Sequence, residues 1–154
     1  MILPTVHDTH ELGRRVADLL EPGDLVLLTG RLGAGKTVLA QGIGAGLGVS
    51  GPVTSPTFVI ARIHRGGRLT MVHVDAYRLG GVAEIDDLDL DATLEEAATV
   101  VEWGGGLAER LADAHLEIRL ERTEDHESRL AEMVPVGGTW QRRLSELGRS
   151  SARR

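Results

Sequence analysis

The spacing of apolar residues changes at about residue 21. Before that point they recur every three to four positions, as on one buried face of a helix; they are Leu12, Val16, Leu19 and Leu20. Asp8, with Glu11 three residues later, predicts the start of this helix with Asp8 as its cap. After the turn at 21–24, residues 25–29 form a continuous run of strand length, which is typical of a buried central strand.

Further along, strand-like and helix-like segments continue. Two pairs of strand-like segments are each joined by a short polar stretch, which predicts hairpins at 58–74 and 116–135. A short strand is expected at 99–102. Helices are expected at 36–47, within 84–96 with Asp91 as a cap, at 107–114 and at 139–147. Gly42, Gly44 and Gly46 weaken the first of these helices.

The segment Gly-Arg-Leu-Gly-Ala-Gly-Lys-Thr at 30–37 joins the predicted central strand to the helix that follows it. It matches the phosphate-binding pattern G-x-x-x-x-G-K-[ST] in full, in the strand–loop–helix context that this pattern requires. Lys36 is the one lysine among 17 Lys and Arg residues. A compact ammonium suits the β- and γ-phosphates better than a planar guanidinium does. The sequence therefore predicts a three-layer, P-loop NTPase-like α/β fold with a mixed parallel and antiparallel central sheet.

Nucleotide contacts are expected along this loop and at the start of its helix. The backbone N–H groups of 32–37 would surround the phosphates, aided by the positive end of the helix dipole. The Thr37 hydroxyl would reach Mg²⁺. The residues expected to bind the nucleotide are Gly30, Arg31, Leu32, Gly33, Ala34, Gly35, Lys36, Thr37 and Val38.

Two carboxylates follow apolar strand segments. Asp75 comes after the run that ends at Val74, and Glu102 comes after Val100 and Val101. Ligand sites of α/β proteins lie at the carboxyl ends of strands, so both residues are candidates for the chemistry of the phosphate loop. One of them would hold Mg²⁺ through water, and the other would orient the attacking water.

Composition narrows the class of protein. The 154 residues fit one core, and the absence of cysteine excludes disulfides and thiolate metal sites. There is neither a signal-peptide pattern nor an apolar run of membrane-spanning length, so a cytoplasmic protein without membrane contact is expected. The net charge is −6, and five arginines against one glutamate follow Thr139, so the rest of the chain is strongly acidic, which argues against a stand-alone nucleic-acid binder. We expect an ATPase domain at 1–136, followed by a helix and a flexible basic tail at 137–154.

Four motifs occur in a specific order. After the phosphate loop come Ser-Pro-Thr-Phe at 55–58, His-Val-Asp-Ala-Tyr-Arg-Leu at 73–79 and Val-Glu-Trp at 101–103. This series resembles the TsaE family of bacterial ATPases, which is required for threonylcarbamoyladenosine modification of tRNA. The resemblance runs from about residue 5 to residue 130. It is specific, because the later motifs at this spacing are much rarer than the phosphate loop alone.

The resemblance implies a role for each matching residue. Lys36 would bind phosphates and act in catalysis, Thr37 and Glu102 would coordinate Mg²⁺, and Asp75 would be the Walker B-like carboxylate needed for hydrolysis and a further candidate metal ligand. Thr57 lies in a switch-like loop that would sense the γ-phosphate, Trp103 would lie beside the nucleotide, and Thr9 would approach the base.

The resemblance also implies how the protein works with others. The family binds ATP or ADP with Mg²⁺, and its ATPase activity supports two partner proteins that modify tRNA at adenosine 37. The tRNA would then be contacted only indirectly. No role for Arg129 follows, because the stretch 125–129 departs from the glycine-arginine pair that is frequent in the family.

Two other functions agree with a phosphate loop. A small-molecule kinase of this class usually needs an arginine-rich lid, and the stretch 80–98 contains no arginine. A nucleotide-gated binding module would bind ATP and turn it over negligibly when alone. Turnover measured alone, with candidate metabolites and with the tRNA-modifying partners distinguishes these three functions.

Overall fold

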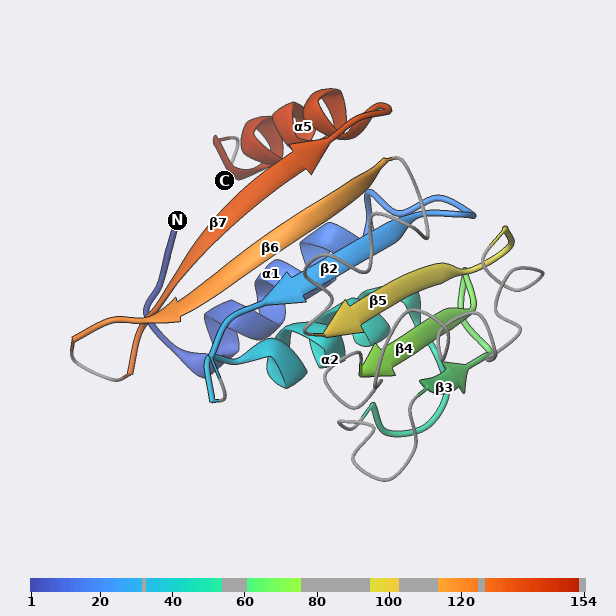
Figure 1. The fold of residues 1–154 in the computed structure, drawn as a ribbon, viewed down its shortest axis with the longest axis horizontal. Helices are drawn as coiled ribbons and strands as arrows, with labels where there is room; N and C mark the ends of the chain where they lie inside the picture. Colours follow the sequence, from blue (N-terminus) through green and yellow to red (C-terminus); the bar gives the residue numbers. More distant parts are fainter. Residues whose placement is uncertain (32, 54–60, 76–94, 103–113, 125–126, 153–154) are drawn as a thin grey trace.

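The structure is a computed structural model that describes residues 1–31, 33–53, 61–75, 95–102, 114–124 and 127–152. Its strands are β1 (Ile2–Leu3), β2 (Leu25–Thr29), β3 (Ala61–His64), β4 (Met71–Asp75), β5 (Ala98–Glu102), β6 (His115–Arg122) and β7 (Arg129–Val136). Its helices are α1 (Val6–Ala17), α2 (Lys36–Leu47) and α5 (Trp140–Ala152). The strands form one sheet in the order β1-β7-β6-β2-β5-β4-β3 (Figure 1).

The sheet mixes both strand directions, as predicted. β2 pairs in parallel with β5 on one side and with β6 on the other, and β4 pairs in parallel with β5. The two predicted hairpins are present as the antiparallel pairs β3–β4 and β6–β7. The central position predicted for β2 is confirmed, as is the α/β class. The two-residue strand β1, antiparallel to β7, was not predicted.

The start of α1 corrects a prediction. Thr5, not Asp8, is the N-cap: its Oγ1 accepts from the N–H of Asp8 at 3.2 Å. Asp8 is the third residue of the helix, and its Oδ2 accepts from the N–H of Thr5 at 2.9 Å. The two residues form a capping box that satisfies two backbone donors reciprocally, so the helix begins three residues earlier than expected.

Glycines let α1 and α2 pack in very close contact. A Cβ at Gly13 would overlap the carbonyl oxygen of Leu39, and a Cβ at Gly42 would overlap that of His10. At Gly46 a Cβ would lie 2.8 Å from another carbonyl oxygen of α1. Gly42 and Gly46, two of the glycines that weaken α2 as an isolated helix, are therefore required where the two helices cross.

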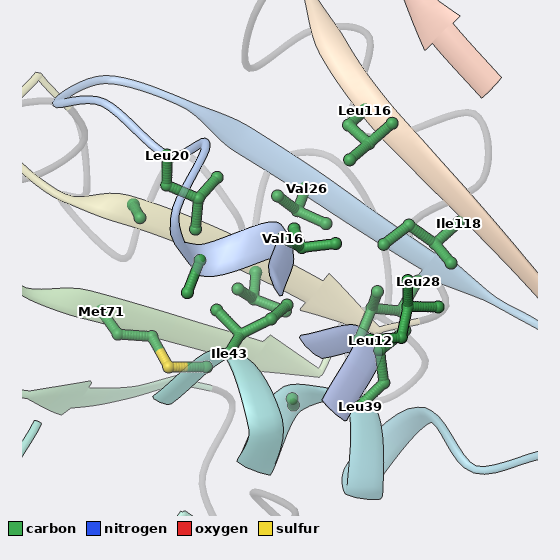
Figure 2. Close-up of a cluster of buried hydrophobic side chains, with 14 of the residues drawn as sticks. Leu12, Val16, Leu20, Val26, Leu28, Leu39, Ile43, Met71, Leu116 and Ile118 are labelled. Atoms are coloured by element: carbon green, nitrogen blue, oxygen red, sulfur yellow. The ribbon is translucent and has the colours of Figure 1, made fainter. Parts of the chain in front are cut away.

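The core lies between these helices and the sheet (Figure 2). Figure 2 shows Leu12, Val16 and Leu20 from the α1 region meeting Leu39 and Ile43 of α2, with the strand residues Val26, Leu28, Met71, Leu116 and Ile118. Each of these ten residues is at most 2% exposed. Burial of each such side chain stabilises the fold by about 1.5–3 kcal/mol. This core fixes α2, and with it the loop that enters α2.

The predicted C-terminal helix is present as α5 and is longer than expected. Trp140 is 1% exposed and belongs to the same core cluster as the residues of α1. Arg143 lies 4.3 Å from the Trp140 ring and pairs with Asp24 through N–O distances of 2.5 and 3.2 Å. Arg15 of α1 donates to the carbonyl oxygen of Leu147 at 2.9 Å. The first part of the basic C-terminal segment is therefore packed against the body.

The helices predicted within 84–96 and at 107–114 lie, except for residues 95, 96 and 114, in the ranges 76–94 and 103–113, outside the described residues. Within the described ranges no helix is long and apolar enough to cross a membrane.

Candidate functional site

The phosphate loop leaves the central strand and enters α2, as its sequence predicts. β2 ends at Thr29 and α2 begins at Lys36. Gly33 and Gly35 have φ angles of 81° and 105°, in the left-handed region that favours glycine. At Gly30, where φ is 146°, a Cβ would also overlap the carbonyl oxygen of Leu120. These three loop glycines therefore sit where larger residues would not fit this backbone.

Lys36 turns back over the loop. It is 4% exposed, and its Nζ donates to the carbonyl oxygens of Gly30 at 2.7 Å and Arg31 at 3.0 Å. A lysine ammonium can donate three hydrogen bonds from one point. The positive charge of Lys36 therefore lies inside the loop, where it would contact an anion that the loop encloses.

The N-terminus of α2 opens onto the same loop. Its N-cap is Gly35, which has no side chain to accept from the first helical N–H groups. Those N–H groups lack acceptors within the helix, and together with the helix dipole they favour an anion. This half of the site fits a phosphate group through backbone geometry as well as through Lys36.

Two arginines of the hairpin β6–β7 hold the outside of the loop. Arg122 Nε donates to the carbonyl oxygen of Gly33 at 3.1 Å, and Arg129 Nε donates to that of Ala34 at 3.0 Å. In a trans peptide the C=O and the next N–H point in opposite directions. The N–H of Gly35 is therefore directed away from Arg129. The sequence did not reveal these two bonds, because 89 and 95 residues separate the bonded partners.

The two residues predicted to supply carboxylates are backbone neighbours at strand ends. β4 and β5 are parallel, and Asp75 pairs in register with Glu102. On the other side of β5, Glu102 pairs with Leu28 of β2, one residue before the strand ends at Thr29. The expectation that both residues reach the edge of the sheet where the phosphate loop begins is therefore confirmed by the register.

Glu102 has a buried partner that the sequence did not assign. His73 Nε2 lies 2.5 Å from Glu102 Oε2, and the two side chains are 0% and 5% exposed. A carboxylate oxygen accepts and an imidazole N–H donates, so His73 Nε2 is assigned as the donor of this hydrogen bond. The signal was present in the sequence: His73 precedes Asp75 by two residues, which places both on one face of β4.

Two cavities lie against the phosphate loop. One of about 700 Å³ separates Gly30, Arg31 and Ala34 from the hairpin residues Arg119 and Arg122. A smaller one of about 30 Å³ lies between the two helices and the hairpin; it is lined by Val6, Thr9, Gly35, Val38, Glu127 and Arg129. Thr9 is 2% exposed, and its Oγ1 has no hydrogen-bond partner among the described residues. The structure thus places Thr9 and Val38 beside the loop, and the nucleotide contacts expected of them stay predictions.

Three predicted site residues lie outside the described residues: Leu32, Thr57 and Trp103. For Asp75 the backbone position is described and the side chain is not. The roles expected for these four side chains stay predictions.

Comparison with known proteins agrees with this geometry. The family described as threonylcarbamoyl adenosine biosynthesis protein TsaE matches residues 3–131. A tRNA threonylcarbamoyladenosine biosynthesis protein TsaE from Mycobacterium tuberculosis is 54% identical over 138 residues, which cover 84% of this chain and 82% of that protein. The protein of the same name from Streptomyces coelicolor is 53% identical over 135 residues, or 86% of this chain and 91% of its own length.

A solved structure shares the fold. The crystal structure of Bacillus subtilis YdiB superimposes with a TM-score of 0.81 at 29% sequence identity, and the match covers 98% of this chain and 94% of that one. The family match includes the phosphate loop, His73, Asp75, Glu102 and Arg129. The chain belongs to the TsaE family of threonylcarbamoyladenosine biosynthesis proteins.

Proposed function

We propose that this protein binds ATP with Mg²⁺ at the loop 30–37 and hydrolyses it to support threonylcarbamoyladenosine formation at adenosine 37 of tRNA. It acts in the cytoplasm as an accessory subunit beside two partner proteins that carry out the transfer. The observation that carries the proposal is the placement of Lys36 inside a glycine loop that joins the central strand to α2, with Glu102 at the end of the adjacent parallel strand.

Phosphate binding rests on charge and on backbone donors. Lys36 lies buried over the loop, and the N-terminus of α2 adds N–H groups that lack acceptors in the helix. Contacts of this kind are charge-assisted and are about twice as strong as neutral hydrogen bonds. The loop therefore supplies most of the affinity for ATP or ADP.

The available donors also fit Mg²⁺. The Thr37 hydroxyl and the carboxylates of Glu102 and Asp75 are oxygen donors, which this hard cation prefers. Its contribution when bound is to neutralise negative charge on the phosphates. Thr37 and Glu102 would hold it, and Asp75, the register partner of Glu102, would orient the attacking water or bind the cation through water.

An accessory role agrees with what the chain lacks in sequence. It contains no cysteine nucleophile, and its net charge of −6 disfavours direct binding of tRNA. The acidic stretch 84–96, which falls largely outside the described residues, is a candidate docking face for a partner. Membership of the TsaE family favours this role over a small-molecule kinase.

Reconstitution tests the proposal. The two partner proteins, substrate tRNA and ATP are incubated with or without this protein over several turnovers, and modified adenosine is measured. We expect multi-turnover modification only when the protein is present, and we expect Lys36→Ala to fail. Arg142→Ala, at an exposed position of α5, is the control that should behave like the parent. Modification that continues without the protein would contradict the accessory role, and full support by Lys36→Ala would contradict the ATP-driven part.

A further inference from the structure

One buried histidine contacts the candidate carboxylate of Glu102. His73 is completely buried on β4, two residues before Asp75 and on the same face of the strand. It bonds Glu102 of the neighbouring strand at 2.5 Å, and Glu102 is itself the register partner of Asp75. His73 Nδ1 has no hydrogen-bond partner among the described residues. Its described hydrogen bonding is therefore directed to Glu102 alone.

We propose that His73 is a positioning residue, which fixes the side chain of Glu102 so that the other carboxylate oxygen, Oε1, is presented to Mg²⁺. The inference rests on the proposed function, because it needs Glu102 to act on the cation. His73 itself touches neither nucleotide nor metal in this account.

The physical argument starts from the freedom of a glutamate side chain. An unrestrained glutamate samples many rotamers, and ordering such a side chain costs up to about 1.5–2 kcal/mol. At Glu102 one oxygen is already held by a hydrogen-bond donor on the neighbouring strand, so part of this ordering is complete before the cation arrives. Carboxylates that bind metals are regularly held in this way, and loss of such a partner costs about 10- to 100-fold in metal affinity or activity.

Burial gives the pair a second, purely structural explanation. A carboxylate that is only 4% exposed needs a hydrogen-bond donor whatever its function. On this explanation, loss of His73 would lower the stability of the fold without a specific effect on Mg²⁺. The two explanations therefore differ in one measurable quantity, the gain in ATP affinity that Mg²⁺ produces.

Calorimetric titration of ATP, with Mg²⁺ and with a chelator, measures that gain. We expect His73→Leu to reduce it by about 10- to 100-fold, while the affinity for ATP in chelator stays within about twofold of the parent because the loop and Lys36 are intact. His73→Gln should recover most of the gain, because its amide nitrogen can donate from nearly the position of Nε2.

Buried His64 on the adjacent strand β3 provides the matched control. It is 8% exposed, and its Nε2 has no hydrogen-bond partner among the described residues. His64→Leu removes a second buried imidazole from the same part of the sheet without removing a donor to Glu102. We expect it to retain the full Mg²⁺-dependent gain in ATP affinity.

A double-mutant cycle completes the test. Glu102→Gln should lose the Mg²⁺-dependent gain, and His73→Leu added to it should cause no further loss, since His73 acts through Glu102. If His73→Leu does not fold, His73→Asn replaces it, because its shorter amide does not reach Oε2. If Mg²⁺ does not raise the ATP affinity of the parent protein, both this inference and the proposed metal site are wrong. If Mg²⁺ raises the ATP affinity of the parent and of the His73→Leu variant by the same factor, this inference alone is wrong.

Discussion

At the scale of single residues, the surroundings of Lys36 explain why the chain uses lysine at this one position and arginine at every other basic position. Its ammonium is buried and donates to two carbonyl oxygens of the loop, on Gly30 and Arg31. A guanidinium is a larger planar group whose donors point outward in a fixed fork. Such a group does not fit a closed loop that must also admit a phosphate, whereas a point charge does.

We expect Lys36→Ala to weaken ATP binding by at least about tenfold, because the loss of a charge-assisted phosphate contact costs about 1.5–3 kcal/mol. Lys36→Arg should restore little of this affinity, for the geometric reason just given. Calorimetric titration with ATP and Mg²⁺ measures both variants, and thermal unfolding checks that each is folded. A Lys36→Arg protein that binds as tightly as the parent would show that charge alone decides binding.

His64 supports a prediction about pH. Burial lowers the pKa of His64 below its ordinary value of 6.5, and repulsion from His73 and Arg62 acts in the same direction. Below pH 6.5 the unfolded chain therefore binds a proton at this position more readily than the folded protein does. Stability is lost as the pH falls through that value, and above it this residue has no effect.

We expect His64→Gln to lose less stability than the parent between pH 7.5 and pH 5.5. Urea unfolding at the two pH values gives the free energy of unfolding for each protein. For each protein we compare the change in the free energy of unfolding between the two pH values, so any effect of the substitution that does not depend on pH cancels. Equal losses in the two proteins would contradict the lowered pKa.

The sequence predicted where single residues lie better than it predicted their contacts. It placed Lys36 at the start of α2 through the phosphate-loop motif, and it placed Glu102 at a strand end because Glu102 follows an apolar run. It missed the bond of Glu102 to His73, because residues 29 positions apart are brought together only by the pairing of β4 with β5. It misplaced the N-cap of α1 for a different reason. Thr5 and Asp8 both belong to the capping box, and the sequence pattern does not say which of the two is the N-cap.

At the scale of elements, packing overrides propensity in α2. Gly42, Gly44 and Gly46 lower its intrinsic stability by roughly 0.5–1 kcal/mol each relative to alanine. The helix was still predicted because the phosphate-loop pattern requires one there. What the sequence could not reveal is the close crossing with α1, at which Gly42 lies against His10. β1 was missed because two residues are too few to show a strand pattern.

We expect Gly42→Ala to destabilise the protein, although alanine is the better helix former. The added Cβ would overlap the backbone of His10, and overpacking of this kind costs typically about 1–3 kcal/mol. Ala45→Gly, at an exposed position of the same helix, is the matched control and should lose only about 0.5–1 kcal/mol. Urea unfolding measures both. A Gly42→Ala protein more stable than the parent would mean that the helices do not cross so closely.

At the scale of the whole molecule, the site is assembled from strand ends that are distant in sequence. β2 ends at Thr29, β4 at Asp75 and β5 at Glu102, and parallel pairing brings these ends to one edge of the sheet. The α/β class and the position of β2 could be predicted from the apolar runs and the motif. The full strand order could not, because it depends on long-range pairings such as that of β2 with β6.

The C-terminal segment raises a question about the extent of the folding unit. The sequence predicts an ATPase domain at 1–136 followed by a helix and a flexible tail. In the structure, α5 contributes Trp140 to the core, and Arg143 joins it to Asp24 beside β2. These contacts lead us to expect that α5 unfolds together with the sheet, even though the family match ends at residue 131.

We expect a chain that ends after Gly138 to unfold at least about 6 °C below the full chain. Loss of a buried tryptophan alone costs about 3–5 kcal/mol, and each kcal/mol lowers the melting temperature of a protein of this size by roughly 2–4 °C. Trp140→Ala in the full chain should reproduce most of the shift, whereas Arg142→Ala, at an exposed position of α5, should cause none. Calorimetric scans compare the four proteins. If the shortened chain melts with the parent, α5 lies outside the cooperative unit, and the boundary at residue 136 separates an independent domain from its tail.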